Sequence, residues 1–225
     1  MLIQKHGAFG CKKGRRCMTT ENQLLIFVRN PEVGKVKTRL AKTVGDQKAL
    51  AVYKLLLEHT QKITQPVSAV KKVWYSDYIN RQDIWPNTKF QKQLQPEGDL
   101  GCKMEAAFKQ AFAGGFSKVM IIGSDCFELT TELLEQAFLA LDSHDVVAGP
   151  AADGGYYLLG MKQLHLSFFR NKTWSTDLVL QQTLYDAAEQ NLNVKLLPVL
   201  NDIDTEADLM ASGIDIETIA VAEKA

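Results

Sequence analysis

Residues 119–125 read VMIIGSD, and this short stretch decides the fold class. It begins with an unbroken apolar run, which is typical of a strand covered on both faces, and the glycine then ends the strand. Strands of that kind belong to largely parallel sheets with helices on either side. Because such sheets bind ligands at the carboxyl ends of their strands, we look for a site in the residues that directly follow each apolar run.

Outward from this strand, apolar patterns of helical spacing alternate with further short apolar runs. We expect strands at 24–28, 67–75, near 90, at 146–149, 156–159 and 194–200. We expect helices at about 46–62, 104–112, 133–141, 177–189 and 206–211, and a loop from 29 to about 44. This alternation predicts an α/β protein built as a three-layer, mostly parallel sheet with helices on both faces.

A single domain accounts for most of the 225 residues. We expect it to span residues 19–212, with a disordered basic extension over 1–18 and a C-terminal tail over 213–225. The extension has no apolar run as long as a signal peptide core or a membrane helix. Either it has no function, or it is an arm that contacts nucleic acid or lipid.

Composition restricts the class of protein further. The formal net charge is zero, so the total gives no reason to expect nucleic acid or a membrane surface as a partner. The four cysteines form no CxxC pair, and no histidine lies at zinc-ligand spacing from them. We therefore expect a reduced, cytoplasmic protein without a membrane span.

A basic loop follows the first expected strand. Within eleven residues it contains four cations, one acid and a glycine, which lets backbone N–H groups approach an anion. It is not a Walker A loop, because Arg29 occupies the position of that motif's first glycine and Val36 that of its serine or threonine. The alternative is a solvated basic loop without a ligand. The residues that we expect to bind a nucleotide are Phe27, Arg29, Asn30, Pro31, Gly34, Lys35, Lys37, Thr38 and Arg39.

Carboxylates follow two of the expected strands. Asp125 comes directly after the most apolar strand, and Asp202 and Asp204 come after the last one. In extended backbone, residues two apart point to the same side, so the last two carboxylates can converge. Together the three predict a site for Mg²⁺ or Mn²⁺, which prefer oxygen ligands. The alternative is that each carboxylate only caps a helix, since Thr130 and Thr205 begin helical patterns nearby.

Two further segments face the same expected edge. Asp153-Gly154-Gly155-Tyr156 joins two apolar stretches; either it is a hairpin turn, or its backbone and carboxylate contact a substrate. Trp174-Ser175-Thr176 precedes a helical pattern, where Thr176 is expected as the N-cap. The alternative is that this segment forms a wall facing the acceptor substrate.

These segments, in this order, resemble a bacterial family of glycosyltransferase-A-like proteins over residues 24–209. The family is known as a domain of unknown function or as transferase 1 of radical-SAM and selenium-linked gene clusters, and it is tied to arsenosugar-type glycosyl transfer. The resemblance rests on the segments Phe27–Pro31 with Gly34–Leu40, Gly98–Gly101 with Met104, Gly123–Cys126, Gly149–Gly160, and Asp202–Thr205 with Asp208-Leu209. One departure is Phe127, which stands where the family usually has proline.

The resemblance implies a Rossmann-like nucleotide-diphospho-sugar transferase core. The family is also similar to guanylyltransferases that activate phospholactate or phosphoenolpyruvate, and these place carboxylates like Asp125, Asp202 and Asp204 on magnesium. The expected function is metal-dependent transfer of a sugar from a nucleotide-diphospho-sugar to a small-molecule acceptor, with Asp125, Asp153 and Asp204 as catalytic residues. One alternative is a nucleotidylyltransferase that joins a nucleoside triphosphate to a small acidic phosphorylated acceptor. The other is a nucleotide-binding protein without catalysis.

Overall fold

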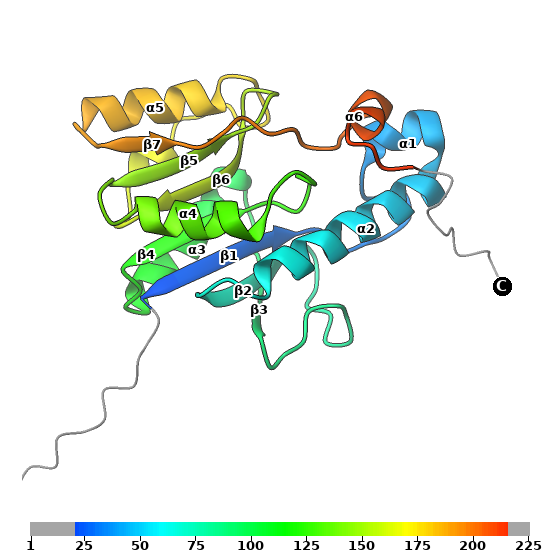
Figure 1. Cartoon of the computed structure of the whole chain (residues 1–225), viewed down its shortest axis with the longest axis horizontal. Helices are drawn as coiled ribbons and strands as arrows, with labels where there is room; N and C mark the ends of the chain where they lie inside the picture. Colours follow the sequence, from blue (N-terminus) through cyan, green and yellow to red (C-terminus); the bar gives the residue numbers. More distant parts are fainter. Residues whose placement is uncertain (1–20, 216–225) are drawn as a thin grey trace, which may run out of the picture.

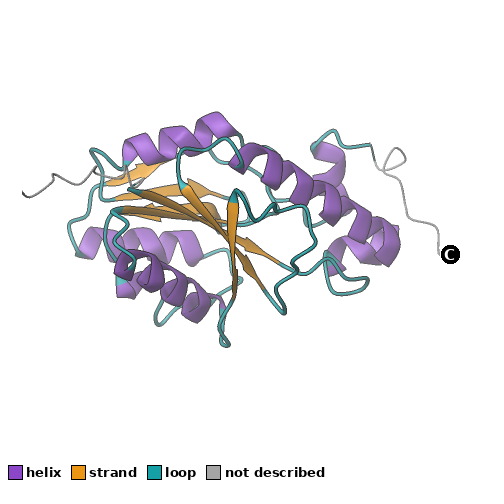
Figure 2. Ribbon diagram, turned by 90° about the horizontal axis from the view of Figure 1, so that it is seen from below, coloured by secondary structure: helices purple, strands orange, loops and turns teal. Residues whose placement is uncertain are grey.

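A seven-stranded mixed sheet runs through the protein in the strand order β3-β2-β1-β4-β6-β5-β7. The computed structural model describes residues 21–215, shown in two views in Figures 1 and 2. The strands are β1 (Asn22–Val28), β2 (Val70–Tyr75), β3 (Phe90–Leu94), β4 (Lys118–Ile122), β5 (Val146–Pro150), β6 (Tyr156–Met161) and β7 (Val194–Leu196). Neighbouring strands are parallel except where β6 pairs with β4 and β5.

Helices cover both faces of this sheet, as Figure 2 shows. They are α1 (Thr38–Val44), α2 (Asp46–Thr64), α3 (Leu100–Ala113), α4 (Thr131–Ala140), α5 (Val179–Glu189) and α6 (Glu206–Ala211), with a short 3-10 helix η1 (Leu166–Phe168). α2 and α4 contribute to the core on one face, and α3, α5 and η1 to the core on the other. The expected three-layer α/β fold is therefore confirmed.

Beyond their first residues, β1 and β4 are apolar because both of their faces are buried. In β1, Leu24 and Ile26 belong to the core under α2 and α4, whereas Leu25 belongs to the core under α3 and α5. In β4, Ile121 and Ile122 divide between the two cores in the same way. This alternation explains the unbroken apolar run from which the fold was predicted.

A third apolar cluster holds α1, α2 and α6 together. Its buried members include Leu40 of α1, Leu56 of α2, Leu209 of α6, and Ile203 in the segment before α6. Figure 1 shows α6 and α1 side by side at the same end of the molecule. The cluster therefore brings the segment after β1 against the segment that follows the last strand.

The expected loop from 29 to 44 is wrong in its second half, which forms α1. This helix has seven residues and only Leu40 is buried, so no apolar repeat marks it in the sequence. Gly45 rather than Asp46 occupies the N-cap position of α2. Asp46 instead begins the first turn, where a negative charge is favourable.

Further boundaries differ from expectation. β2 begins at Val70 and not at residue 67, and α3 begins at Leu100 and not at residue 104. The last strand ends at Leu196 and not at residue 200, and Pro198 in the following segment has no N–H to offer a ladder. α5 begins at Val179 with Leu178 at its N-cap position, so Thr176 does not cap it. The Thr176 hydroxyl instead donates to the carbonyl of Thr173 at 2.8 Å.

Other expectations hold. Gly114 ends α3, and α6 spans the predicted residues 206–211. The expected extension over 1–18, and residues 216–225 of the expected tail, lie outside the described residues. Within the described part of the chain, no helix combines the length and the apolar character that crossing a bilayer requires.

Candidate active site

A cleft of about 1200 Å³ opens at the carboxyl ends of β1, β2, β3 and β4. It gathers most of the residues that the sequence suggested, from both halves of the chain. The expected residues that line it are Phe27, Arg29, Asn30, Lys35, Lys37, Thr38, Arg39, Asp125, Asp153, Gly155, Tyr156, Trp174, Ser175, Thr176, Asp202 and Asp204. Pro31, Gly34 and Gly154 lie beside the cleft lining without being part of it.

A buried ammonium lies at the centre of the charged part of the cleft. The side chain of Lys37 is 3% exposed, and its Nζ lies 2.7 Å from Asp125 Oδ1 and 3.0 Å from Asp204 Oδ1. Arg39 lies farther out, with a nitrogen 3.7 Å from Asp204 Oδ2. Burial lowers the pKa of Lys37, but the charges of Asp125 and Asp204 outweigh it and leave that pKa above its ordinary value. The ammonium is therefore positively charged in this site.

The backbone conformation of Lys37 orients its side chain. Lys37 has φ 47° and ψ 44°, a left-handed conformation that is unusual for a residue with a side chain. It immediately precedes α1, whose packing against α2 and α6 fixes the position of the turn. Strain of this kind occurs mainly at functional positions, where the surrounding structure holds it in place.

The two carboxylate segments are joined by their backbones. The N–H of Ile203 donates to the carbonyl of Asp125 at 2.9 Å, and Cys126 forms an isolated antiparallel bridge with Asp202. The residues on either side of Ile203 are therefore held next to the end of β4. Asp202 and Asp204 converge with Asp125 although β7 and β4 are not neighbours in the sheet.

Negative charge in this cluster is incompletely balanced. Burial, and then the charge of Asp125, raise the pKa of Asp202 to about 7, while Lys37 acts in the opposite direction. Asp125 Oδ1 is buried and has no hydrogen bond of good geometry, in spite of its close approach to the Lys37 ammonium. A donor set of carboxylate oxygens with one oxygen unsatisfied fits a hard divalent cation in its chemistry. Within the described residues, however, no group of three His, Cys, Asp or Glu side chains is arranged closely enough to hold a metal ion.

Tyr53 of α2 links the two strand ends that carry the charged residues. Its hydroxyl accepts from the Arg29 backbone N–H at 2.8 Å and lies 3.2 Å from both the Arg29 carbonyl and Ser124 Oγ. The hydroxyl thus connects the end of β1 to the end of β4. Burial raises the pKa of Tyr53 well above its ordinary value, so the hydroxyl remains protonated and can donate.

Asn30 organises the loop after β2. Its Oδ1 accepts from the backbone N–H of Asp77 at 3.0 Å, and its Nδ2 donates to the carbonyl of Tyr78 at 2.9 Å. The side chain is almost completely buried. These bonds hold this wall of the cleft together, and Asn30 is itself part of the wall.

The opposite wall of the cleft consists of two packed loops. A Cβ at Gly154, whose φ is +86°, would lie 2.1 Å from the carbonyl oxygen of Asp177. A Cβ at Gly101 would lie 2.4 Å from Trp174 Nε1. Glycine at both positions therefore lets the segment 173–178 lie against the turn after β5 and the first turn of α3. The Asp153 segment is both the hairpin turn between β5 and β6 and part of the cleft wall.

Sequence analysis did not find several residues that line the cleft. Tyr53 has the spacing of a core residue on α2, so nothing in the sequence indicates that its hydroxyl reaches the cleft. Ser76 and Gln95 follow β2 and β3, and the rule about strand ends would have found them with better boundaries. Asp99 and Lys103 lie at the start of α3, beside a segment that was noted only for its resemblance.

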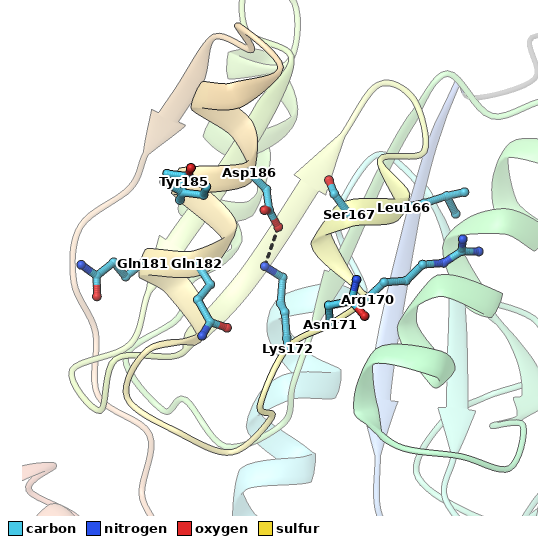
Figure 3. Close-up of a pocket in the computed structure, with 9 residues that line it drawn as sticks. All are labelled: Leu166, Ser167, Arg170, Asn171, Lys172, Gln181, Gln182, Tyr185 and Asp186. Carbon is cyan, nitrogen blue, oxygen red and sulfur yellow. Dashed lines mark hydrogen bonds and ion pairs between the residues drawn. The ribbon is translucent and has the colours of Figure 1, made fainter.

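A second cavity of about 620 Å³ lies outside the cleft, between η1 and α5 (Figure 3). Its buried Lys172 is paired with Asp186, with 2.6 Å between Nζ and Oδ2, and Gln182 and Tyr185 lie on the same helix as Asp186. The basic loop and the carboxylates that converge on Lys37 do not border this cavity. We therefore assign the chemistry to the cleft.

The sequence matches one known protein family over the middle of the chain. Residues 59–176, more than half of the chain, match the model of the family described as "Uncharacterized protein conserved in bacteria (DUF2064)". The chain belongs to the DUF2064 family. The matched region contains Asp125, Asp153 and Trp174, whereas the basic loop and Asp204 lie on either side of it.

Solved structures agree with the fold of this DUF2064 protein. A protein of Desulfovibrio desulfuricans G20, described as a candidate nucleotide-diphospho-sugar transferase, is 33% identical, with 85% of each chain covered and a TM-score of 0.77. The expected nucleotide-diphospho-sugar transferase fold is thus confirmed, and transferase is the enzyme class that the comparison indicates.

More distant structures share the fold alone. CMP:2-keto-3-deoxy-manno-octonic acid synthetase complexed with CTP is 11% identical, covers 86% of this chain and 99% of its own, and has a TM-score of 0.54. The 4-diphosphocytidyl-2C-methyl-D-erythritol synthase of Anaerococcus prevotii DSM 20548 is 10% identical, with 85% and 93% covered and a TM-score of 0.52. Among curated proteins, no sequence matches this DUF2064 protein significantly.

Proposed function

We propose that this protein is a metal-dependent glycosyltransferase that moves a sugar from a nucleotide-diphospho-sugar to a small-molecule acceptor. One observation carries the proposal: a buried ammonium, two carboxylates in contact with it and a basic loop meet in one cleft at the carboxyl ends of parallel strands. The related Desulfovibrio protein, with its description as a candidate nucleotide-diphospho-sugar transferase, supports the proposal.

The basic loop is the proposed site of the diphosphate. Lys35 is 66% exposed and Arg39 68% exposed, so both can turn toward an anion in the cleft. Lys37 is fixed deeper, beside the carboxylates. Positive groups that are already in position stabilise the charge that develops on a departing diphosphate.

The carboxylates of Asp125, Asp202 and Asp204 would hold Mg²⁺ or Mn²⁺. A divalent cation at this position supplies positive charge to the phosphates of the leaving nucleotide. Ile203 fixes the spacing of this group through its backbone bond to Asp125, so the carboxylates are held in place before any ligand binds.

The proposed acceptor side is the wall formed by Asp153, Tyr156 and Trp174. Asp153 either positions the sugar or accepts the proton of the acceptor hydroxyl as its oxygen attacks the sugar carbon. The bond between that carbon and the phosphate oxygen then breaks, and the nucleoside diphosphate departs. Tyr156 and Trp174 offer aromatic surface, which suits the apolar face of a sugar ring.

A second candidate function is nucleotidylyl transfer from a nucleoside triphosphate to a small acidic acceptor. The observation in its favour is the presence of Lys35, Lys37 and Arg39 in one loop, which suits a triphosphate at least as well as a diphosphate. In that reaction the acceptor attacks the α-phosphorus and pyrophosphate leaves.

Product analysis separates the two functions. The protein is incubated with Mg²⁺, a mixed acceptor extract and either nucleotide-diphospho-sugars or nucleoside triphosphates, and the released nucleoside diphosphate and pyrophosphate are measured separately. Acceptor-dependent nucleoside diphosphate from a nucleotide-diphospho-sugar supports glycosyl transfer. Acceptor-dependent pyrophosphate, with no diphosphate from any sugar donor, would replace it with nucleotidylyl transfer. Nucleotide binding without either product would support the non-catalytic alternative.

We also propose a cytoplasmic location for the protein. Cys102 and Cys126, the two cysteines within the described residues, are both free thiols, and Cys126 is buried beside the active-site carboxylates. Free thiols are typical of a reducing compartment. The absence of nucleic acid among the partners stays a prediction from the net charge.

A further inference from the structure

The position where a divalent cation would bind in this cleft already contains a positive charge. The Lys37 ammonium lies between Asp125 and Asp204, within 3.0 Å of an oxygen of each. Both carboxylates are 42% exposed and face the cleft, whereas the lysine side chain is 3% exposed and approaches them from the protein side. The ammonium therefore has little freedom to turn into solvent, and the carboxylates are open to a cation from the cleft.

The same carboxylate oxygens cannot serve both cations fully. Asp204 Oδ1 accepts the hydrogen bond from Lys37, and Asp125 Oδ1 has the ammonium as its nearest positive group. A metal ion that took these oxygens as ligands would lie within a few ångströms of the ammonium and would repel it. Binding the metal thus requires Lys37 to give up part or all of its ion pairs.

We propose that Lys37 is an exchangeable internal cation, which neutralises Asp125 and Asp204 in the empty protein and competes with the divalent cation for them. The inference rests on the proposed function and concerns the regulation of the same site. The displaced ammonium would then be available to the phosphates of a nucleotide at the basic loop, the proposed site of the diphosphate. Metal alone then binds weakly, and metal together with nucleotide binds tightly.

The left-handed backbone of Lys37 is consistent with this role. A glycine would adopt φ 47° without strain, but it would remove the ion pair of Asp125 and leave Asp204 with only the more distant Arg39. The strained lysine instead holds together two chain segments whose negative charges would otherwise repel each other.

Mn²⁺ binding in the absence of nucleotide tests the proposal. Free Mn²⁺ is measured by electron paramagnetic resonance for the full chain, for Lys37→Met and for the control Lys172→Met. The control matches in chemistry, because Lys172 is 2% exposed and paired with Asp186 at 2.6 Å but lies outside the cleft. We expect Lys37→Met to bind Mn²⁺ about tenfold more tightly than the parent, within the usual range of coupling between sites, and Lys172→Met to bind it like the parent.

Thermal melting provides a second readout that does not depend on activity. Both variants should melt below the parent without metal, because each leaves a carboxylate without its partner. Saturating Mn²⁺ should raise the melting temperature of Lys37→Met more than that of the parent or of Lys172→Met. If Lys37→Met does not fold, Lys37→Asn replaces it, since asparagine tolerates the left-handed conformation and is too short to reach the carboxylates.

The outcomes distinguish this inference from the proposed function. If the parent binds Mn²⁺ and the Lys37 variants bind it equally or more weakly, the exchange is overturned and the metal site remains. If neither the parent nor the variants bind Mn²⁺ without nucleotide, the exchange is overturned. If they still do not bind it when a nucleoside diphosphate is added, the metal-dependent function is overturned as well.

Discussion

Replacing Tyr53 by phenylalanine removes a single oxygen that joins the two charged strand ends. The hydroxyl accepts one hydrogen bond, from the Arg29 N–H, and donates another to either the Arg29 carbonyl or Ser124 Oγ. The ring stays, so no sizeable cavity forms. Loss of these bonds, with a donor left unsatisfied, should lower the free energy of unfolding by about 1–3 kcal/mol. For a chain of this size, that predicts a melting temperature lower by about 2–12 °C.

Tyr53→Phe should also weaken ligand binding, because the hydroxyl positions Arg29 relative to Ser124. Isothermal titration calorimetry with inorganic pyrophosphate and Mg²⁺ is the assay, and we expect affinity to fall at least about twofold, the lower end of coupling between residues in contact. Tyr157→Phe is the matched control, since its hydroxyl donates one bond to the carbonyl of Pro198 at 3.0 Å and does not line the cleft. The control should lose stability but keep its affinity. Equal affinities for the two variants, or an unchanged melting temperature for Tyr53→Phe, would refute the reasoning.

Three other predictions follow from the packing and the charges. In calorimetry, Gly154→Ala should melt at a clearly lower temperature than the control Gly115→Ala. Both glycines have φ +86°, but only at Gly154 would the new Cβ meet a backbone oxygen, which is that of Asp177 at 2.1 Å. Equal melting temperatures would contradict this steric conflict. Asp125→Asn should lower turnover by at least about a hundredfold while circular dichroism stays that of the parent, and full activity of the parent in EDTA would count against the metal. Partial burial raises the pKa of Asp208, but hydrogen bonds within the cap of α6 outweigh it and leave the pKa below 3.8. A lowered pKa stabilises the fold above the pKa of the unfolded state. In urea titrations, Asp208→Asn should therefore be less stable than the parent at neutral pH, and this difference should shrink as the pH falls below about 4. A difference that does not change with pH would contradict the assignment.

The sequence predicted the sheet well because its strands are buried on both faces. After Lys118 at its start, β4 has no polar position, and the apolar run therefore marks its bounds to within one residue. Short elements could not be predicted in this way. α1 buries only Leu40, and β7 has three residues, none of them fully buried, so neither produces a repeat that exceeds chance.

The candidate site divides along similar lines. Asp125 was found because it directly follows an apolar run, and Asp204 because it comes shortly after another, a rule that depends only on local sequence. That Lys37 is buried between them could not be predicted, since a lysine in a short basic loop is ordinarily solvated. Its burial depends on α1 packing against α6, which is a contact between distant parts of the chain.

The hydrogen bond from Lys37 to Asp204 joins residues 167 positions apart. Strands β3, β2, β1 and β4, which are neighbours in the sheet, all come from the first 122 residues, so they can pair while the rest of the chain is still being synthesised. The charged cluster cannot form until residue 204 has emerged and the segment after β7 has returned to the end of β4. Closing so long a loop has a large entropic cost, which slows the formation of the contact. We therefore expect the site to be among the last features of the protein to form. A chain truncated before residue 200 would keep these strands and lack the charged cluster.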